Sequence, residues 1–271
     1  LGNHLKIALR NMIRDRQFTL LNLIGLSTGM ACAFLIYLWA SDELSKDKFH
    51  EKDSQLFQVM KNNTDSQGIE TDENTPGILA STLLKEIPEV EKSVSIFPPA
   101  EFTFNGILSW EDTRMKAKSK FADKDFFNIF SHPLIQGNKD RVLLDKNAIV
   151  ISEALALRLF KTPERAIGKT VNWNGERYNG KFHVTGVFKT LPTSASIQFD
   201  MLFSYSYLYD KFPSLSDWAS SNASTYVILK KNTDIANFNH KISNFIKSKF
   251  KASTLTLFVR PYSDRYLYGD Y

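Results

Sequence analysis

The sequence has 271 residues and a formal net charge of +5 at neutral pH. Its first 17 residues hold four cations against one acidic side chain, so the rest of the chain is nearly neutral, which argues against nucleic-acid binding because that function needs a concentrated basic face. The single cysteine, Cys32, lies in an apolar segment near the start, so disulfides cannot stabilise the remainder.

Residues 1–17 are predicted to form an amphipathic helix on the cytoplasmic surface of a membrane. Apolar residues recur here at helical spacing beside a row of cations that would lie near anionic headgroups. A basic flank that only sets membrane topology explains the same residues equally well, and both interpretations stay open. The apolar residues are Leu5, Ala8, Leu9, Met12 and Ile13, and the cations are Lys6, Arg10 and Arg14.

Residues 18–40, FTLLNLIGLSTGMACAFLIYLWA, contain no charge and are predicted to form a transmembrane helix. A helix of this length reaches roughly 34 Å, and the hydrocarbon core of a bilayer is about 30 Å thick. A cleaved signal peptide and a lipoprotein signal at Cys32 are disfavoured, because the apolar run continues to Trp39 beyond the small residues. The basic residues before the segment place the N-terminus in the cytoplasm and the rest of the chain outside.

Three small residues, Gly25, Gly29 and Ala33, recur at every fourth position of this segment. Small residues at this spacing allow two helices to approach closely in lipid. We therefore predict a packing face toward other membrane helices. The alternative is that glycine and alanine are simply common in membrane helices.

Four polar residues follow the apolar segment, and they are Asp42, Glu43, Asp47 and His50. Their spacing does not match a metal-binding pattern. We interpret them as a hydrogen-bonded neck that fixes the angle of the following domain on the helix, rather than as a ligand site.

Residues 41–271 are predicted to form an α+β domain, because two β-α-β patterns flank a β-rich middle. The chain would leave a small α/β sandwich, form a second subdomain and return. The first pattern consists of a strand at 56–60, a helix that opens at Thr75-Pro76 and a strand at 90–97, and the second of a strand at 225–229, one helix at 234–250 and a strand at 255–259.

The middle, from 102 to 203, is rich in strand signals that Gly, Asn and Asp turns separate. A short helix is predicted at 125–130, and another at 153–160 with Ser152 as its N-cap. Residues 173–176, Trp-Asn-Gly-Glu, are predicted to form a tight hairpin turn, because Asn-Gly accepts positive φ at low cost.

The sequence carries no recognisable catalytic or cofactor-binding pattern. There is no glycine-rich phosphate loop, no nucleophile-elbow serine motif and no cysteine outside the apolar segment. These absences predict a protein that is not an enzyme and that holds no metal or cofactor. The five histidines share no metal-ligand spacing, and they are His4, His50, His132, His183 and His240.

Several stretches, in order, resemble the MacB-like periplasmic core domain of FtsX-type permeases in ABC transporters, in the branch common among Bacteroidetes. The opening LKIALRNMIRDRQFTLLNLIGLSTGMACAFLIYLW resembles the N-terminal elbow and first membrane helix of that family. SDELSKDKFHEKDSQLFQV resembles its first segment beyond the membrane. Further blocks are DKDFFNIFSHPLIQGN, NAIVISEALALRLF, AIGKTV and FHVTGVFKTLPTSASIQFD.

The resemblance implies a Porter-like subdomain at 42–100 and 204–271, and a Sabre-like insert at 101–203. It implies a bacterial inner-membrane protein whose main domain lies in the periplasm, and which moves when a cytoplasmic ABC ATPase partner hydrolyses ATP. A second permease copy or a paralogue would complete a dimer, with membrane lipid around the helix. The substrates would be peptides, lipoproteins or toxic compounds.

The sequence contains one membrane helix, so under this resemblance we expect it to be the N-terminal part of a permease. Two functions from other classes stay open at this point. One is a single-pass, membrane-anchored sensor with an extracytoplasmic ligand domain. The other is a membrane-anchored envelope hydrolase, which the missing catalytic motifs disfavour.

Overall fold

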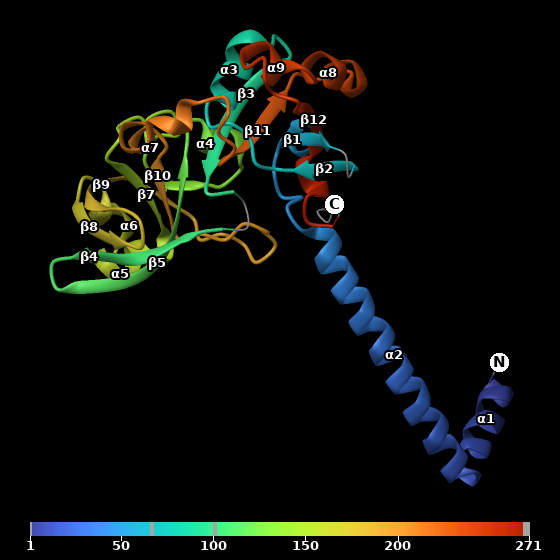
Figure 1. The fold of residues 1–271 in the computed structure, drawn as a ribbon. Helices are drawn as coiled ribbons and strands as arrows, with labels where there is room; N and C mark the ends of the chain where they lie inside the picture. The colour runs from blue at the N-terminus through green and yellow to red at the C-terminus, as the bar shows by residue number, and fades with distance from the viewer. Residues whose placement is uncertain (1, 66–67, 100–101, 268–271) are drawn as a thin grey trace. The chain divides into compact units, whose positions relative to one another are not determined.

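The structure is a computed structural model, and it describes residues 2–65, 68–99 and 102–267 (Figure 1). The chain divides into two compact units, Leu1–Ser45 and Lys46–Tyr271. The first unit contains two helices, and the second contains all the strands. We call the second unit the core domain.

The first unit consists of α1 (Gly2–Arg14) and α2 (Arg16–Ser45). The chain turns sharply at Asp15 between them (Figure 1). The hydroxyl Oγ1 of Thr19 donates a hydrogen bond of 2.9 Å to the carbonyl oxygen of Met12 and so joins the two helices across the turn. The helix α1 covers most of the range 1–17 that was predicted to be helical.

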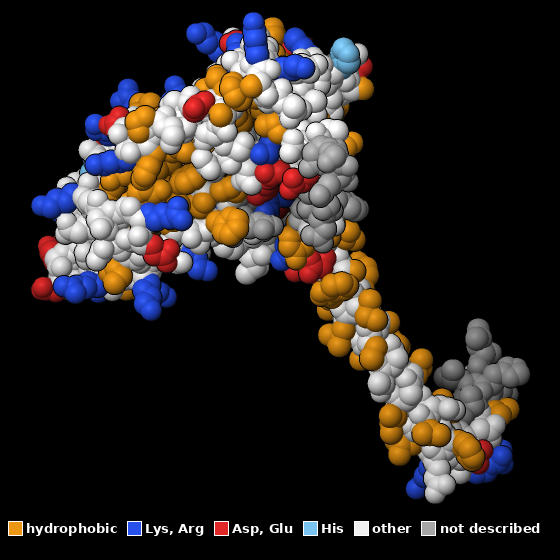
Figure 2. All heavy atoms as spheres, in the orientation of Figure 1, with side chains coloured by type: hydrophobic (Ala, Val, Ile, Leu, Met, Phe, Trp, Pro, Cys, Tyr) orange, Lys and Arg blue, Asp and Glu red, His pale blue; other side chains and the backbone are white. Residues whose placement is uncertain are grey.

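The helix α2 has 30 residues and is long and apolar enough to cross a membrane. It is longer than the predicted segment 18–40 and ends only at Ser45, because neither proline nor glycine follows Ala40 to break it. Asp42 and Glu43 consequently lie on its last turns. None of the residues of α2, all of which are described, is buried, and Figure 2 shows hydrophobic side chains along its length.

The strands of the core domain form one sheet of twelve strands within the described residues. The first six are β1 (Leu56–Asp65), β2 (Gly68–Asp72), β3 (Val90–Phe97), β4 (Phe104–Trp110), β5 (Thr113–Ala122) and β6 (Leu134–Gln136). The last six are β7 (Ala148–Ser152), β8 (Thr170–Gly175), β9 (Asn179–Phe188), β10 (Met201–Ser204), β11 (Ser224–Leu229) and β12 (Thr256–Pro261).

Seven α-helices belong to the described part of the core domain. They are α3 (Leu79–Glu86), α4 (Phe126–Ile129), α5 (Glu153–Phe160), α6 (Pro163–Ala166), α7 (Ser206–Lys211), α8 (Ile235–Ile242) and α9 (Phe245–Lys249).

One end of the sheet has the order β3-β11-β1-β12, with every neighbouring pair antiparallel. The strand β11 therefore separates the parallel strands β1 and β3, and β1 separates the parallel strands β11 and β12. The two predicted β-α-β units are thus interleaved as split units. The helices α3, α8 and α9 cover one face, where Leu83, Phe238 and Ile246 are buried against the strands (Figure 1).

The other end of the sheet closes into a six-stranded barrel. Its order is β5-β4-β8-β9-β7-β10, and β10 pairs back to β5 in parallel, with Ser204 opposite Ala122. Large aromatic side chains fill the interior, where the rings of Phe121 and Phe203 lie 4.9 Å apart between centroids and Trp173 contacts Phe203 at 5.5 Å. The barrel therefore encloses a packed core and not a channel.

The two ends of the sheet meet where β3 pairs with β5, through Ile96 opposite Ala122 and Phe97 opposite Phe121. Lys120 is fully buried beside this junction, and its ammonium donates hydrogen bonds to backbone carbonyl oxygens, including that of Pro99 at 2.9 Å. Through the pairing of β3 with β5, the sheet continues from the split β-α-β units into the barrel.

The predicted single helix at 234–250 is wrong, because two helices, α8 and α9, lie in this range. Asp234 caps α8 by accepting hydrogen bonds from the N–H groups of Ala236 and Asn237. The carbonyl oxygen of Ser243 accepts a hydrogen bond of 3.0 Å from the N–H of Leu257 in β12 instead of continuing the helix. Packing against the sheet therefore divides an apolar pattern that looks continuous in sequence.

The predicted hairpin turn at 173–176 lies further along the chain, because Asn174 still pairs with Asn179 and only then does the chain reverse. The side chain of Trp173 is 2 % exposed, and this burial fixes the strand register. Two other predictions also differ from the structure. The helix α3 begins at Leu79 rather than at Thr75-Pro76, and the strand β2 lies in a polar stretch where no strand was predicted. The predicted N-cap is confirmed, since Ser152 Oγ accepts from Leu155 N–H at 3.3 Å.

Candidate functional site

The predicted small-residue face lies on α2. Successive fourth residues of a helix are rotated by about 40°, so Gly25, Gly29 and Ala33 lie along one side. A Cβ atom at either glycine would meet nothing within 4 Å. The face is thus open within its own unit, as a surface for a partner helix requires.

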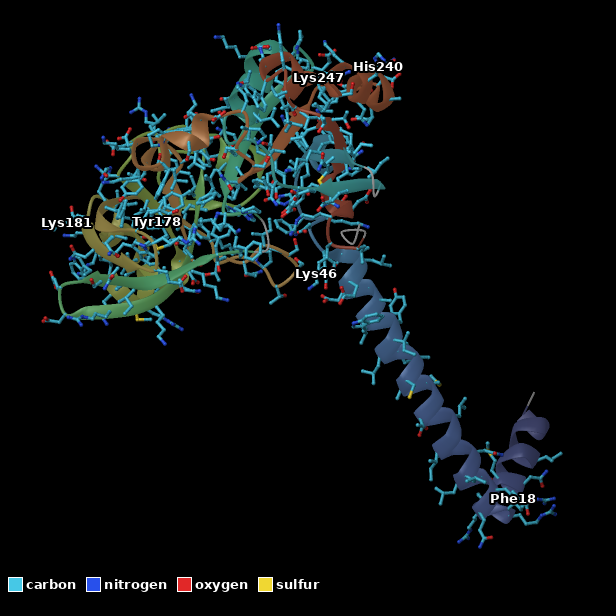
Figure 3. The ribbon with its side chains drawn as sticks, in the orientation of Figure 1. Phe18, Lys46, Tyr178, Lys181, His240 and Lys247 are labelled. Atoms are coloured by element: carbon cyan, nitrogen blue, oxygen red, sulfur yellow. The ribbon has the colours of Figure 1, made fainter. Side chains whose placement is uncertain are left out.

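The segment that follows α2 is fixed to a distant loop of the core domain. The ammonium of Lys46, labelled in Figure 3, donates a hydrogen bond of 3.1 Å to the carbonyl oxygen of Thr193, and the N–H of Asp47 donates to Ser194 at 2.9 Å. The carboxylate of Asp47 is fully buried and accepts from both the N–H (2.8 Å) and the hydroxyl of Ser196. The first residues after α2 are therefore held by backbone and side-chain bonds.

The same serine connects Asp47 to the C-terminal part of the described chain. Arg265 Nη1 donates to Ser196 Oγ at 3.1 Å, and its Nε lies 3.6 Å from the carboxylate of Glu73. Glu73 in turn accepts from Gln58 Nε2 at 2.8 Å. We call these five residues, Asp47, Gln58, Glu73, Ser196 and Arg265, the polar clamp.

The electrostatics of the polar clamp favour the charged form of Arg265. Burial opposes its positive charge, but Tyr226, Glu73, Tyr262 and Asp47 together raise the pKa of the guanidinium. The guanidinium therefore stays protonated and can donate a hydrogen bond to Ser196 and form an ion pair with Glu73 at any physiological pH.

Sequence reasoning did not place two histidines together, but the fold does. The rings of His50 and His132 lie 5.6 Å apart between centroids, and Ser131 N–H donates to His50 Nδ1 at 3.1 Å. Burial lowers the pKa of His50 to about 4 and that of His132 to about 3, so both are neutral at pH 7. Among the described residues no group of three possible metal ligands exists, and the pair lies among aromatic rings such as Phe130. The histidines therefore serve packing.

The four residues of the predicted neck lie in different surroundings. Asp47 belongs to the polar clamp and His50 to the aromatic cluster beside it, whereas Asp42 and Glu43 belong to α2. The sequence could not identify Ser196 and Arg265 as partners, because they follow Asp47 by about 150 and 220 residues with no shared motif. The only local signal in the sequence is an aspartate that follows a membrane-type helix directly.

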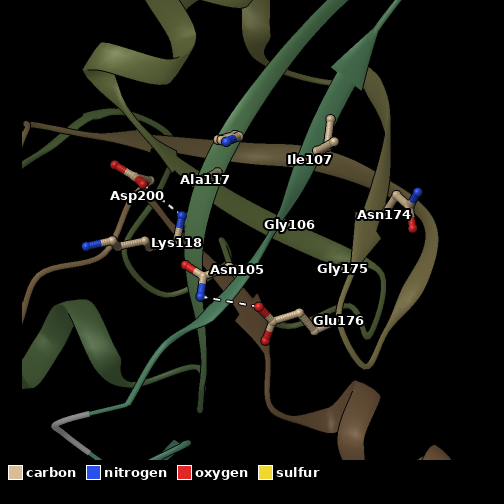
Figure 4. Close-up of a pocket in the computed structure, with 10 residues that line it drawn as sticks. Asn105, Gly106, Ile107, Ala117, Lys118, Asn174, Gly175, Glu176 and Asp200 are labelled. Carbon is tan, nitrogen blue, oxygen red and sulfur yellow. Dashed lines mark hydrogen bonds between the residues drawn. The ribbon is translucent and has the colours of Figure 1, made fainter.

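The barrel carries a hollow of about 660 Å³ over β4, β5 and β8 (Figure 4). Its floor includes Gly106 and Gly175, which lie opposite each other. Gly175 ends β8 and so has the strand-end role that glycine often indicates, whereas Gly106 lies inside β4. A Cβ atom at either position would lie 2.4 Å from the indole of Trp173, so the glycines make room for that ring. The rim is mixed in charge, with Lys116, Lys118, Glu176 and Asp200, and it presents no catalytic arrangement.

The fold is similar to that of solved periplasmic and extracellular domains. A domain assigned to a permease protein from Porphyromonas gingivalis has 21% sequence identity and a TM-score of 0.63, and the similarity covers 79% of this chain and 93% of that one. The periplasmic region of MacB from Actinobacillus actinomycetemcomitans has 20% identity and a TM-score of 0.54, with 78% and 90% covered. The extracellular domain of the noncanonic ABC-type transporter YknZ from Gram-positive bacteria has 14% identity and a TM-score of 0.50, with 75% and 99% covered.

No curated protein matches the sequence. The family model of the MacB-like periplasmic core domain, in contrast, matches residues 19–245, which include most of α2 and the core domain up to the start of α9. This family is one of periplasmic domains of permeases and not an enzyme family. The chain belongs to the family of MacB-like periplasmic core domains.

Proposed function

We propose that this chain is the periplasmic, non-catalytic part of an ABC transporter permease and that it moves when a cytoplasmic partner hydrolyses ATP. The observation that carries the proposal is the polar clamp. Asp47 lies two residues after the end of α2 and is bonded to Ser196, which also binds Arg265. A displacement of α2 would therefore reach both chain segments of the clamp together, rather than being absorbed by a flexible linker.

In this proposal α2 spans the inner membrane with its N-terminus in the cytoplasm and the core domain in the periplasm. The cations Lys6, Arg10 and Arg14 of α1 would lie near anionic lipid headgroups. The face of Gly25, Gly29 and Ala33 would pack against other helices of the permease.

In this proposal the two ends of the sheet are the two subdomains. The Porter-like subdomain, 42–100 and 204–271, would contain the split β-α-β units, and the Sabre-like insert, 101–203, most of the barrel. The short pairing between β3 and β5 joins them. Beside this pairing, buried side chains of both ends share one hydrophobic core, in which the rings of Phe130 and Tyr226 lie 5.3 Å apart between centroids.

The partners in this proposal are a cytoplasmic ABC ATPase subunit and a second permease copy or paralogue. Movement of the periplasmic domains would export or handle peptides, lipoproteins or toxic compounds on the outer side of the membrane. The chain itself would carry out no chemistry.

The test is co-purification from native membranes of the complete gene product that contains this sequence. We expect an ABC ATPase subunit in a stoichiometric complex with it. Recovery of a sensor kinase or another regulator, with no ATPase, would contradict the proposal and would support an extracytoplasmic sensor.

A further inference from the structure

A second cleft, of about 330 Å³, lies where the two ends of the sheet meet. It opens at the C-terminal ends of the parallel strands β5 and β10, between them and α3, β3 and α7. Asp123 follows β5 directly, and Ser204 is the last residue of β10. The pairing of Ala122 with Ser204 therefore brings this carboxylate and this hydroxyl to one edge.

The hydroxyl groups that line the cleft donate their protons to the protein itself. Ser81 Oγ donates to Ile78 at 3.0 Å, Ser93 Oγ to Ala80 at 2.7 Å, Ser204 Oγ to Leu143 at 2.9 Å and Tyr209 Oη to Gly77 at 3.2 Å, in every case to the backbone carbonyl oxygen.

These bonds also determine where the proton of a fifth hydroxyl, that of Ser206, points. Ser206 Oγ lies 2.7 Å from Ser204 Oγ. Because Ser204 gives its single proton to Leu143, Ser206 must be the donor of this pair. All five hydroxyl oxygens therefore retain only lone pairs for a ligand in the cleft.

The carboxylate of Asp123 adds a strong acceptor at this edge, and the carboxylate of Asp125, which pairs with Lys92, also lines the cleft. Asp123 Oδ2 accepts a hydrogen bond of 2.9 Å from the N–H of Ser95, and no described residue donates one to Oδ1. Asp123 is half-buried and lines the cleft. An acceptor without a donor in such a setting favours a ligand that brings protons of its own.

Apart from Lys124 and Asp125, the rest of the wall is apolar. Leu84 and Leu144 are 38% and 55% exposed, and Leu143 lies beside them. Exposed aliphatic side chains next to a ring of acceptors fit a molecule with an alkyl chain and a cationic end. An ammonium group supplies three donors, and an alkyl chain of a few carbons supplies the apolar contact.

We propose that this cleft binds an alkylammonium group, with the nitrogen at Asp123 and the serine hydroxyls and the alkyl chain along Leu84 and Leu144. The group could belong to a free diamine or to the lysine side chain of a peptide, and the experiment below separates these sources. This site is distinct from the polar clamp and does not depend on the transport function.

The charges around Asp123 set how binding varies with pH. Burial, with a smaller contribution from Asp125, raises the pKa of Asp123 to about 7, against the hydrogen bond from Ser95 and the charge of Lys124, which both lower it. An ammonium ligand stabilises the ionised carboxylate, so affinity should increase as pH rises through about 7. The other ionisable groups that face this carboxylate are Tyr205 and Tyr209, and Lys92 forms an ion pair of 3.3 Å with Asp125.

The test is calorimetric titration of the whole chain in lipid nanodiscs with 1,5-diaminopentane and, separately, with its neutral analogue 1,5-pentanediol. We expect the diamine to bind at least about tenfold more tightly than the diol, because only the diamine makes charge-assisted bonds to Asp123. A blocked peptide with one lysine, compared with the same peptide acetylated on that lysine, shows whether a peptide can supply the group.

Three variants and one control define the site. Asp123→Asn should weaken diamine binding about tenfold or more, and Ser206→Ala about threefold. Lys124→Met removes the competing cation at the rim and should tighten binding. Asp112→Asn changes a carboxylate in the exposed β4–β5 turn and should have no effect.

The proposal is overturned if the diamine and the diol bind equally, or if folded Asp123→Asn binds the diamine as the unaltered chain does. Should Asp123→Asn fail to fold, the Ser206→Ala and Lys124→Met variants decide. Their predicted changes have opposite signs, and unchanged affinity in both would equally overturn the proposal.

Discussion

Asp47 and Ser196 are separated by 149 residues, yet the carboxylate of Asp47 accepts hydrogen bonds from both the backbone N–H and the hydroxyl of Ser196. The aspartate adopts a left-handed backbone conformation, with φ of 59°. This conformation turns the chain just after α2 and directs the buried carboxylate toward the loop that contains Ser196. The relationship ties the residues that leave α2 to the interior of the core domain.

The first prediction concerns Asp47→Asn. Asparagine tolerates the left-handed conformation as well as aspartate does, so the substitution removes the charge and one acceptor without adding backbone strain. We expect the free energy of unfolding of the core domain to fall by about 1–3 kcal/mol. Urea denaturation followed by tryptophan fluorescence measures this change.

The matched control for that change is Asp112→Asn, in the exposed turn between β4 and β5. It should alter the free energy of unfolding by less than about 0.5 kcal/mol. Equal effects of the two substitutions would show that the polar clamp contributes nothing specific.

The second prediction concerns Gly106→Ala. The new methyl group would lie 2.4 Å from the indole of Trp173, which is enclosed in the barrel and cannot move freely. We expect a loss of about 1–3 kcal/mol in the free energy of unfolding. In a Trp173→Leu background the same alanine should cost less, because the clash with the indole is gone and only that with the carbonyl oxygen of Asn174, at 2.8 Å, is left. The control Lys116→Ala, on the exposed face of β5, should cost under about 0.5 kcal/mol, and a comparable cost at both positions would refute the packing explanation.

The third prediction concerns stability at acid pH. His50 and His132 have lowered pKa values, about 4 and about 3, because burial disfavours their charged forms. Their contribution to stability is complete above pH 6.5, where the unfolded chain is also neutral, and it is lost as pH falls from about 6.5 toward 4 and then 3. Each histidine can contribute on the order of 3 kcal/mol to this loss.

Midpoints of urea denaturation between pH 7.5 and 4.5 measure this dependence. A His132→Phe variant should lose stability less steeply as pH falls, if the ring is accommodated. His240→Gln, at an exposed position of α8, should keep the slope of the unaltered chain. A slope that His132→Phe leaves unchanged would mean that other groups govern the acid transition.

The fourth prediction concerns the small-residue face of α2. Gly29→Leu places a bulky side chain on this face, where helices could otherwise approach closely, and we expect less complex with the other membrane helices of the permease. Ala31→Leu is the matched control, because residue 31 lies about 160° away around the helix. Cross-linking yield in native membranes measures the complex. Equal yields for the two variants would exclude this face as the contact.

The sequence predicted those elements whose signals are local. The strand β3 occupies the predicted residues, 90–97, and Ser152 caps α5 as expected. In both cases the apolar pattern or the side-chain oxygen lies within the element itself. The apolar character of α2 likewise follows from neighbouring residues, although the helix extends beyond the predicted segment 18–40.

The remaining features depend on residues far away in the sequence. The strand β2 reads Gly-Ile-Glu-Thr-Asp and is extended only because it pairs with β1. The break between α8 and α9 depends on the bond from Leu257 to Ser243, and the polar clamp depends on Ser196 and Arg265. No local propensity encodes these contacts, because they form only when distant segments of the chain pack together.

The central claim is that the core domain moves with nucleotide state in the membrane complex. The direct measurement is the distance between spin labels at Lys181→Cys in the two permease copies, in a Cys32→Ser background, with and without bound ATP. Lys181 is exposed on β9 and is not part of the polar clamp (Figure 3). The account predicts that ATP shifts the distance distribution and that Asp47→Asn reduces the shift while ATP hydrolysis continues. Identical distributions in both states, in a complex that hydrolyses ATP, would contradict it.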